Sequence, residues 1–135
     1  MKKNCIITFD FEPEWSIVGR QFDSRLWQSG YGSIEKNLNT FLDLCDEREH
    51  KSTIFVVSKI AHHYRKVLRS ALSRGHEIAS HSHTHVDLTR LHEKNLWYEI
   101  SHSKLVLEDM LSHEVYGFRA PRFQLSSHGL ELVQQ

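Results

Sequence analysis

Three histidines at alternating positions form the part of the sequence best suited to chemistry. His81, His83 and His85 lie in the segment 75–87, GHEIASHSHTHVD, directly after a short apolar run. Histidine is the commonest metal ligand in proteins, and its imidazole titrates near neutral pH. The spacing His-Ser-x-x-His therefore indicates that His81 and His85 are a pair of metal ligands.

Two acids near the N-terminus could complete such a site. Asp10 and Glu12 follow the β-prone run 4–9, and because they are two residues apart, a regular strand would point them to the same side. Two imidazoles and one carboxylate form an open ligand set for zinc or a similar divalent ion. Such an ion lowers the pKa of bound water to about 7, and the second carboxylate can take the proton. Arg119 could hold that carboxylate ionised through a charge-assisted pair.

Other interpretations of these residues stay open at the level of sequence. The histidine pair could be incidental residues of a polar loop, and the central His83 could be a ligand in a His-x-His pattern. Glu14 competes with Glu12 for the role of third ligand. Ser82 is expected to fix the loop by hydrogen bonding rather than to act as a nucleophile.

Strand and helix patterns alternate along the chain and position these residues. The expected strands are 4–9, 52–57, 76–80 and 115–119, and the expected helices are 33–49, 59–74, 91–113 and 125–135. The first strand is typical of one buried on both faces, with Ser33 as the N-cap of the next helix and Gly75 as a later helix stop. This alternation favours parallel β/α units, whose ligands bind at the carboxyl ends of the strands. The acids and the histidines follow strand ends and Arg119 is the last residue of its strand, so we expect them at one edge of the sheet.

The composition describes a soluble globular protein with a single domain over residues 1–135. Lysine plus arginine equal aspartate plus glutamate at 17 each, so there is no basic footprint for nucleic acid. No apolar run is long enough for a signal-peptide core or a transmembrane segment. We therefore expect a cytoplasmic protein.

Three motifs, taken in order, resemble a known family. TFDFE at 8–12, HSHTH at 81–85 and GFRAPRF at 117–123 are similar to the first three motifs of the polysaccharide deacetylase (NodB-homology) family, carbohydrate esterase family four. The resemblance covers nearly the whole chain. It implies an α/β fold, a partial, distorted (β/α) barrel of parallel strands with flanking helices. It also implies metal-dependent hydrolysis of an acetyl group from an N-acetylated or O-acetylated sugar or polysaccharide precursor.

The resemblance further implies roles for individual residues. Asp10 would be the catalytic base, oriented by Arg119, and His81 and His85 would bind a divalent metal, with zinc as the expected ion. The residues expected to line the substrate are Trp15, Pro121 and Phe123.

The chain departs from the family pattern at two places. Phe11 stands where family members usually have a second, metal-binding aspartate, so Glu12 is expected to serve as the third ligand. The chain also reaches Gln135 before the family's last two motifs, one of which supplies a general-acid histidine. Four strands are too few to close a barrel. We therefore expect a C-terminally truncated domain whose open edge is covered in a homo-oligomer or by another chain.

Two alternative functions follow from these departures. The chain could be a catalytically inactive remnant, or an assembly subunit, that keeps metal or glycan binding. It could also be a related amide hydrolase that acts on a small non-sugar substrate.

Overall fold

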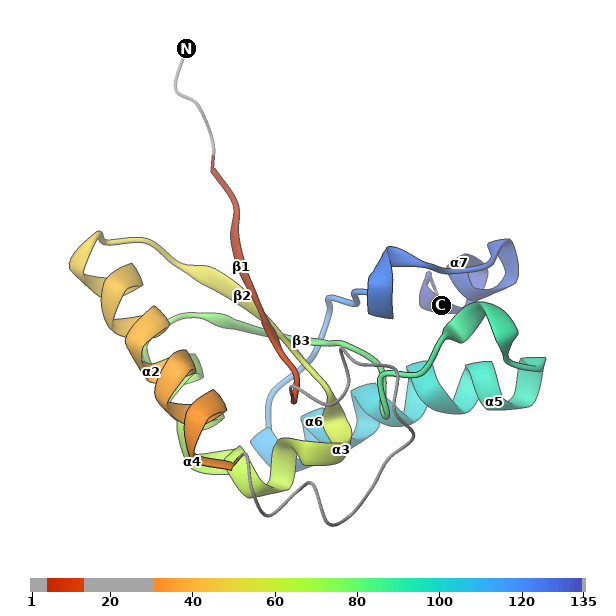
Figure 1. Ribbon diagram of the computed structural model, residues 1–135, viewed down its shortest axis with the longest axis horizontal. Helices are drawn as coiled ribbons and strands as arrows, with labels where there is room; N and C mark the ends of the chain where they lie inside the picture. The colour runs from red at the N-terminus through yellow and green to blue at the C-terminus, as the bar shows by residue number, and fades with distance from the viewer. Residues whose placement is uncertain (1–4, 14–30, 135) are drawn as a thin grey trace.

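A sheet of three parallel strands lies at the centre of the computed structural model, which describes residues 5–13 and 31–134 (Figure 1). The strands are β1 (Ile7–Phe11), β2 (Ser52–Val56) and β3 (Glu77–Ser80), in the order β1-β2-β3. Their register pairs Asp10 with Phe55 and Phe55 with Ala79. The expected α/β fold with parallel strands and flanking helices is confirmed.

Helices connect the strands and cover one face of the sheet (Figure 1). They are α2 (Tyr31–Glu47), α3 (Ser58–Ala61), α4 (Arg65–Ser73), α5 (Glu93–Trp97), α6 (Ser103–Leu111) and α7 (Ser127–Val133), with 3₁₀ turns at His62–Tyr64, Leu88–Arg90 and Pro121–Phe123 and a π turn at Tyr98–His102. The main core packs apolar residues of α2, α4 and α6, among them Leu42, Leu68 and Leu107, against the sheet. A smaller apolar cluster joins α5 and the π turn to α7.

Neither β1 nor β2 is fully buried on both faces, which corrects the prediction for the first strand, whereas the last three residues of β3 are all buried. Along β2, Ile54 and Val56 are fully buried, whereas Thr53 and Phe55 are only half-buried. All four residues of β1 before Phe11 are likewise half-buried. Among the described residues, the helices of the main core pack on one side of these two strands, and the opposite side carries side chains such as Thr8, Asp10 and Phe55.

Several predicted boundaries are shifted. β1 runs to Phe11, two residues beyond the expected end, because it pairs with β2 over the whole length of that strand. Helix α2 begins at Tyr31, so Ser33 lies inside the helix and is not its N-cap. Gly75 is confirmed as a helix stop, with a φ of +83° that favours glycine, and the His76 amide donates to the Ala71 carbonyl.

Two predicted long helices are interrupted. The stretch 59–74 divides into α3, a 3₁₀ turn and α4, and the turn places Tyr64 edge-on to Phe11 with ring centres 5.1 Å apart. The stretch 91–113 contains the π turn Tyr98–His102 between α5 and α6. Both interruptions lie where the helix contacts a distant part of the chain, Tyr64 with Phe11 and Glu99 with His83. Helical periodicity in the sequence does not predict such contacts.

The predicted fourth strand, 115–119, is reduced to a single parallel bridge between Ser80 and Phe118. The Ser80 amide donates to the Gly117 carbonyl at 2.8 Å, and the Arg119 amide donates to the Ser80 carbonyl at 2.9 Å. A Cβ atom on Gly117 would lie 2.9 Å from the Ala79 Cβ atom, so this close approach requires glycine. The bridge is short, yet it fixes Arg119 beside β3.

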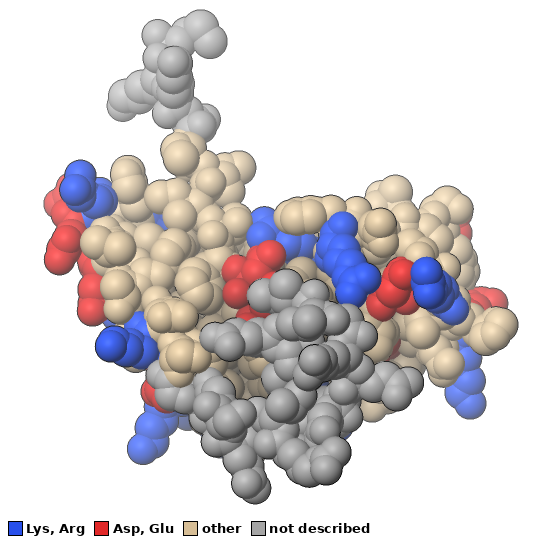
Figure 2. All heavy atoms as spheres, in the orientation of Figure 1, with Lys and Arg blue, Asp and Glu red and all other residues tan. Residues whose placement is uncertain are grey.

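The surface of the described residues mixes both signs of charge. On the face shown in Figure 2, Lys and Arg side chains lie near Asp and Glu side chains rather than in separate patches. This pattern fits the zero net charge of the sequence. Within 5–13 and 31–134, no helix has the length and apolar character that crossing a bilayer requires.

Candidate metal and active site

The strand ends bring the predicted residues to the carboxyl edge of the sheet. Asp10 lies in β1 and Glu12 directly follows it, while His81 directly follows β3. Arg119 reaches the same edge through its hydrogen bond to the last residue of β3. Phe11, between the two acids, is fully buried, so the alternation of strand side chains sends it into the core and the acids to the opposite face.

Glu12, His81 and His85 form a group that could hold a metal ion. One potential ligand atom from each residue lies within 4.8 Å of the other two. The Glu12 Oε2 atom is 2.5 Å from His85 Nε2 and 3.6 Å from His81 Nε2. The structure thus brings together the carboxylate and the two imidazoles that the sequence suggested.

The surroundings of the two imidazoles fit metal binding. His81 Nδ1 lies 2.8 Å from the Arg119 carbonyl oxygen, which can only accept, so Nδ1 carries a proton and Nε2, once deprotonated, is the nitrogen available for a ligand bond. A metal-binding histidine commonly has its second nitrogen held in this way. Among the described residues, the buried His85 Nδ1 atom has no hydrogen-bond partner. Two imidazoles and one carboxylate are also a ligand set of catalytic zinc.

The electrostatics of this group favour an ionised Glu12. Burial by itself raises the pKa of the Glu12 carboxyl, but hydrogen bonds from His81 and His85, together with their charges, outweigh burial and lower the pKa to about 2. A ligating carboxyl must be deprotonated to bind a cation. Glu12 therefore meets this requirement at neutral pH.

The Arg119 side chain contacts residues of β1 and β2 as well as bonding Asp10. Its Nη1 donates to Asp10 Oδ1 at 2.5 Å, and its Nη2 donates to Thr8 Oγ1 at 3.0 Å. The guanidinium carbon lies 3.9 Å from the centre of the Phe55 ring, a stacking contact that further fixes its position. The other Asp10 oxygen, Oδ2, is 3.9 Å from His81 Nε2. Asp10 is thus held at one oxygen while the second lies beside the candidate ligands, where it could accept a proton from water.

His83 lies in a different environment from the two histidines that flank it. Its Nδ1 atom is 2.8 Å from Ser58 Oγ, and its ring packs against the rings of Tyr98 and His102. Burial, followed by the positive charges of His102 and Lys59, lowers the pKa of His83 to about 4. Within the described residues, the group of candidate ligands does not include it.

Glu99 contacts the histidine loop and was not predicted from the sequence. Its carboxylate accepts from the amides of His83 and Thr84 at 3.0 and 2.8 Å and from the Thr84 hydroxyl at 2.6 Å. The sequence did contain a signal, because Glu99 falls on the same helical face as the apolar residues Leu96 and Ile100. An acid within an apolar stripe is costly to bury unless it has hydrogen-bond donors.

The residues predicted to line the substrate are only partly described. Pro121 is buried at the start of its 3₁₀ turn, whereas Phe123 is 78% exposed and its ring centre lies 5.4 Å from the Arg119 guanidinium carbon. Trp15 and Glu14 lie outside the described residues.

Comparisons with known proteins agree with these observations. The chain matches the family model for polysaccharide deacetylase over residues 1–135. No curated protein sequence gives a significant match. A proposed polysaccharide deacetylase from Mycobacterium smegmatis has a TM-score of 0.77 and 23% identity, with 95% of this chain and 46% of that one covered.

Two further solved structures have similar folds. The peptidoglycan deacetylase PdaC from Bacillus subtilis has a TM-score of 0.72 and 23% identity, with 96% of this chain and 53% of that one covered. A CE4 family pseudoenzyme from Bacillus anthracis has a TM-score of 0.75 and 13% identity, with 96% and 39% covered. The chain thus spans about half the length of these structures or less. With its whole length matched by the family model, the chain belongs to the polysaccharide deacetylase family.

Proposed function

We propose that this chain is a metal-dependent deacetylase that hydrolyses an acetyl group from an N-acetylated or O-acetylated sugar or polysaccharide precursor. The observation that carries the proposal is the grouping of Glu12, His81 and His85 beside the hydrogen-bonded pair of Asp10 and Arg119. Family membership supports the reaction class, a hydrolase acting on carbon–nitrogen bonds other than peptide bonds. Zinc is the proposed ion because of the ligand types.

Each residue has a defined part in this reaction. A divalent cation held by Glu12, His81 and His85 would lower the pKa of a water molecule to about 7 and polarise the acetyl carbonyl. Asp10 accepts the proton of the attacking water through Oδ2, the oxygen that lies nearest the ligands. Arg119 fixes the other oxygen of Asp10 and so keeps the base in one orientation.

The surface around Arg119 is the proposed place for the sugar. The exposed Phe123 ring beside the guanidinium offers an apolar wall for a sugar ring, and Pro121 and Trp15 complete this proposed lining. The proposal places the protein in the cytoplasm, with a soluble or lipid-linked sugar as its substrate. Fractionation of cells that express the protein tests this location.

Zinc content and acetate release from a chitooligosaccharide test the proposed function together. The wild-type chain should bind one zinc ion and release acetate, and His81→Ala should lose both. His50→Ala, which changes an exposed histidine, is the matched control and should keep both. Absence of zinc and acetate from the wild-type protein would reject the proposal.

A catalytically inactive remnant, or an assembly subunit, is the second candidate. The similar fold of a CE4 family pseudoenzyme from Bacillus anthracis is the observation that raises this candidate. Zinc bound without acetate release would support this candidate. Release of amine from a small acetylated amide, without action on sugars, would instead support a related amide hydrolase.

Exposed apolar side chains beside the segment 115–118 support a further part of the proposal, self-association or completion by another chain. A cavity of about 480 Å³ lies between α6, the segment 115–118 and α7. Its lining includes the exposed side chains of Trp97, Leu105 and Tyr116. Exposed apolar surface of this kind is covered in many assemblies. A single monomeric species in size-exclusion chromatography would count against it.

A further inference from the structure

One buried carboxylate holds the peptide segment between the two candidate ligands. Glu99 is 7% exposed and comes from the π turn Tyr98–His102, an element remote in sequence from the loop. Its Oε2 accepts from the amides of His83 and Thr84, and its Oε1 accepts from the Thr84 hydroxyl. Three donors therefore converge on a single acceptor-only side chain, which offsets the cost of burying its charge.

The backbone of Glu99 strengthens the same contact. Its carbonyl oxygen accepts from the His83 amide at 3.1 Å, so this amide is shared between the main chain and the side chain of one residue. π turns are rare within helices and occur frequently at functional sites. Here the turn is the place where the helix meets the histidine loop.

The loop itself needs such support, because two of its residues adopt unfavourable backbone angles. Ser82 and His85 have φ values of +64° and +60°, in the left-handed region that favours glycine. Such angles persist only where surrounding contacts determine them. Ser82 Oγ accepts from the His85 amide at 3.0 Å, which confirms its predicted loop-fixing role. The carbonyls of Ser82 and His83 also accept from the first amides of α3, Ser58 and Lys59.

We infer that Glu99 is a positioning residue that sets the directions of the His81 and His85 imidazoles through the peptide between them. This inference rests on the proposed metal site and extends it beyond the residues that would touch the ion. Glu99 acts through backbone amides, and the described contacts of its carboxylate are with His83 and Thr84. Mutation of residues that hold metal ligands in place without touching the ion typically lowers metal affinity by about 10- to 100-fold.

Cobalt(II) binding tests the inference, because its visible absorption reports ligand geometry as well as occupancy. Glu99→Ala should weaken cobalt binding by about 10- to 100-fold in chelator competition and change the absorption bands. Glu99→Gln keeps an acceptor oxygen at the same place and should recover most of the affinity. Asp109→Asn, an exposed acid on the adjoining α6, is the matched control and should behave like the wild type.

Thermal unfolding of each variant separates positioning from general stability. A lower melting temperature for Glu99→Ala with wild-type cobalt affinity and bands would overturn the inference. If Glu99→Ala does not fold, Thr84→Val, which removes the hydroxyl that donates to Glu99 Oε1, carries the test. Altered cobalt bands in Thr84→Val support positioning, and wild-type bands overturn it.

Amide hydrogen exchange distinguishes failure of this inference from failure of the proposed function. If the wild-type chain binds no cobalt, the proposed metal site is wrong, whatever Glu99 does. In that case, faster exchange of the His83 and Thr84 amides in Glu99→Ala than in Asp109→Asn would still show that Glu99 holds the loop. Equal exchange in the two variants would overturn the inference.

Discussion

Strand β3 has a buried histidine at each end, and the surroundings of the two histidines differ. His76 precedes the strand and His81 follows it. His76 Nε2 lies 3.5 Å from Asp46 Oδ1, and His81 Nε2 lies 3.6 Å from Glu12 Oε2. Because His76 Nδ1 accepts from the Ser52 amide, its proton is on Nε2 and faces Asp46. Each end of β3 thus has a buried histidine close to a carboxylate, Asp46 at the amino end and Glu12 at the carboxyl end. The two ends differ in the other groups that contact these carboxylates.

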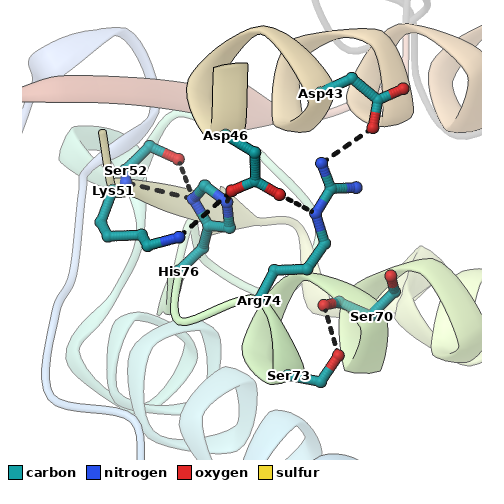
Figure 3. Close-up of polar contacts among 8 residues, drawn as sticks. All are labelled: Asp43, Asp46, Lys51, Ser52, Ser70, Ser73, Arg74 and His76. Carbon is teal, nitrogen blue, oxygen red and sulfur yellow. Dashed lines mark hydrogen bonds and ion pairs between the residues drawn. The ribbon is translucent and has the colours of Figure 1, made fainter. Parts of the chain in front are cut away.

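At the amino end, permanent cations neutralise the acids (Figure 3). Arg74 Nε donates to Asp46 at 2.7 Å, Arg74 Nη2 donates to Asp43 at 2.8 Å, and Lys51 Nζ donates to Asp46 at 3.2 Å. The hydrogen bond from Arg74, followed by that from Lys51, lowers the pKa of Asp46. We call this set of residues the closed group. Its members are Asp43, Asp46, Lys51, Arg74 and His76.

At the carboxyl end, the described contacts of the Glu12 carboxylate are with two imidazoles. Glu12 lies next to His81 Nε2 and His85 Nε2, and the hydrogen bond from His81 Nδ1 to the Arg119 carbonyl leaves Nε2 as the nitrogen that can bind a cation. The comparison teaches that a histidine near a carboxylate is not by itself a site. What distinguishes the carboxyl end is that three potential ligand atoms, from two histidines and one acid, lie within 4.8 Å of one another. This matches the general division between function at the carboxyl ends of parallel strands and stability at their amino ends.

The largest expected effect is on metal binding. His85→Ala should lower zinc affinity at least about 100-fold and abolish acetate release, since one of three ligands is removed. His76→Ala should leave both unchanged, because its imidazole belongs to the closed group. Zinc content by mass spectrometry after dialysis and an acetate assay give the comparison. Equal zinc in the two variants would erase the distinction between the two ends.

The next effect concerns the two aspartates. Asp10→Asn should lower acetate release by about 10²- to 10⁴-fold, because the amide cannot accept the proton of water, while zinc stays bound. Asp46→Asn is the matched change at the amino end and should leave the rate unaltered. Steady-state rates with a chitooligosaccharide, at measured zinc occupancy, check this. A normal rate for Asp10→Asn would remove Asp10 from its proposed role.

For stability, we expect a clear effect from the change at the amino end of β3, which should not affect metal binding or activity. His76→Ala should lower the free energy of unfolding by about 1–3 kcal/mol, because the buried Ser52 amide and hydroxyl lose their shared acceptor. The measurement is urea unfolding followed by circular dichroism, with the exposed His50→Ala as control. An unchanged midpoint for His76→Ala would show that the closed group adds nothing to stability.

A smaller effect is expected in the pH dependence of stability. Burial lowers the pKa of His76, with the nearby Asp46 opposing the shift. The unfolded chain, with a histidine pKa of about 6.5, then binds the proton more readily, so this stabilisation is present above about pH 6.5 and is lost as the pH falls. His76→Gln should therefore lose less stability than the wild type between about pH 7 and 5. Buried His83, present in both proteins, contributes equally to both slopes, and identical slopes would contradict the prediction.

The smallest effect is expected at the exposed rim of the amino-end group. Asp43 is 68% exposed and pairs with Arg74 at 2.8 Å. Because exposed ion pairs contribute about 0–1 kcal/mol, Asp43→Asn should shift the unfolding midpoint barely beyond error. A change as large as that of His76→Ala would mean that the ion pairs, rather than the buried histidine, hold this end together.

Local pattern predicted the alternation of strands and helices and the pairing of the two acids on one side of β1. Both follow from the side-chain periods of helices and strands, which can be read from residues close together in the sequence. The predictions of uninterrupted helices and of a full fourth strand were wrong because those features depend on residues far away in the sequence. The π turn at Tyr98–His102 meets the histidine loop, and the segment 115–119 is limited to one bridge with Ser80, so each depends on a distant partner.

The sequence by itself determined which ligand atoms exist and how they alternate. Phe11 is directed into the core with Asp10 and Glu12 on the other side, and Gly75 takes the positive φ that ends α4. Only the tertiary structure decided that Glu12 lies 2.5 Å from His85. β1 and β3 are far apart in the chain and meet at one edge because each pairs in parallel with β2. Distances between side chains on different strands arise only when backbone hydrogen bonds set the register, and residue spacing along the chain carries no such information.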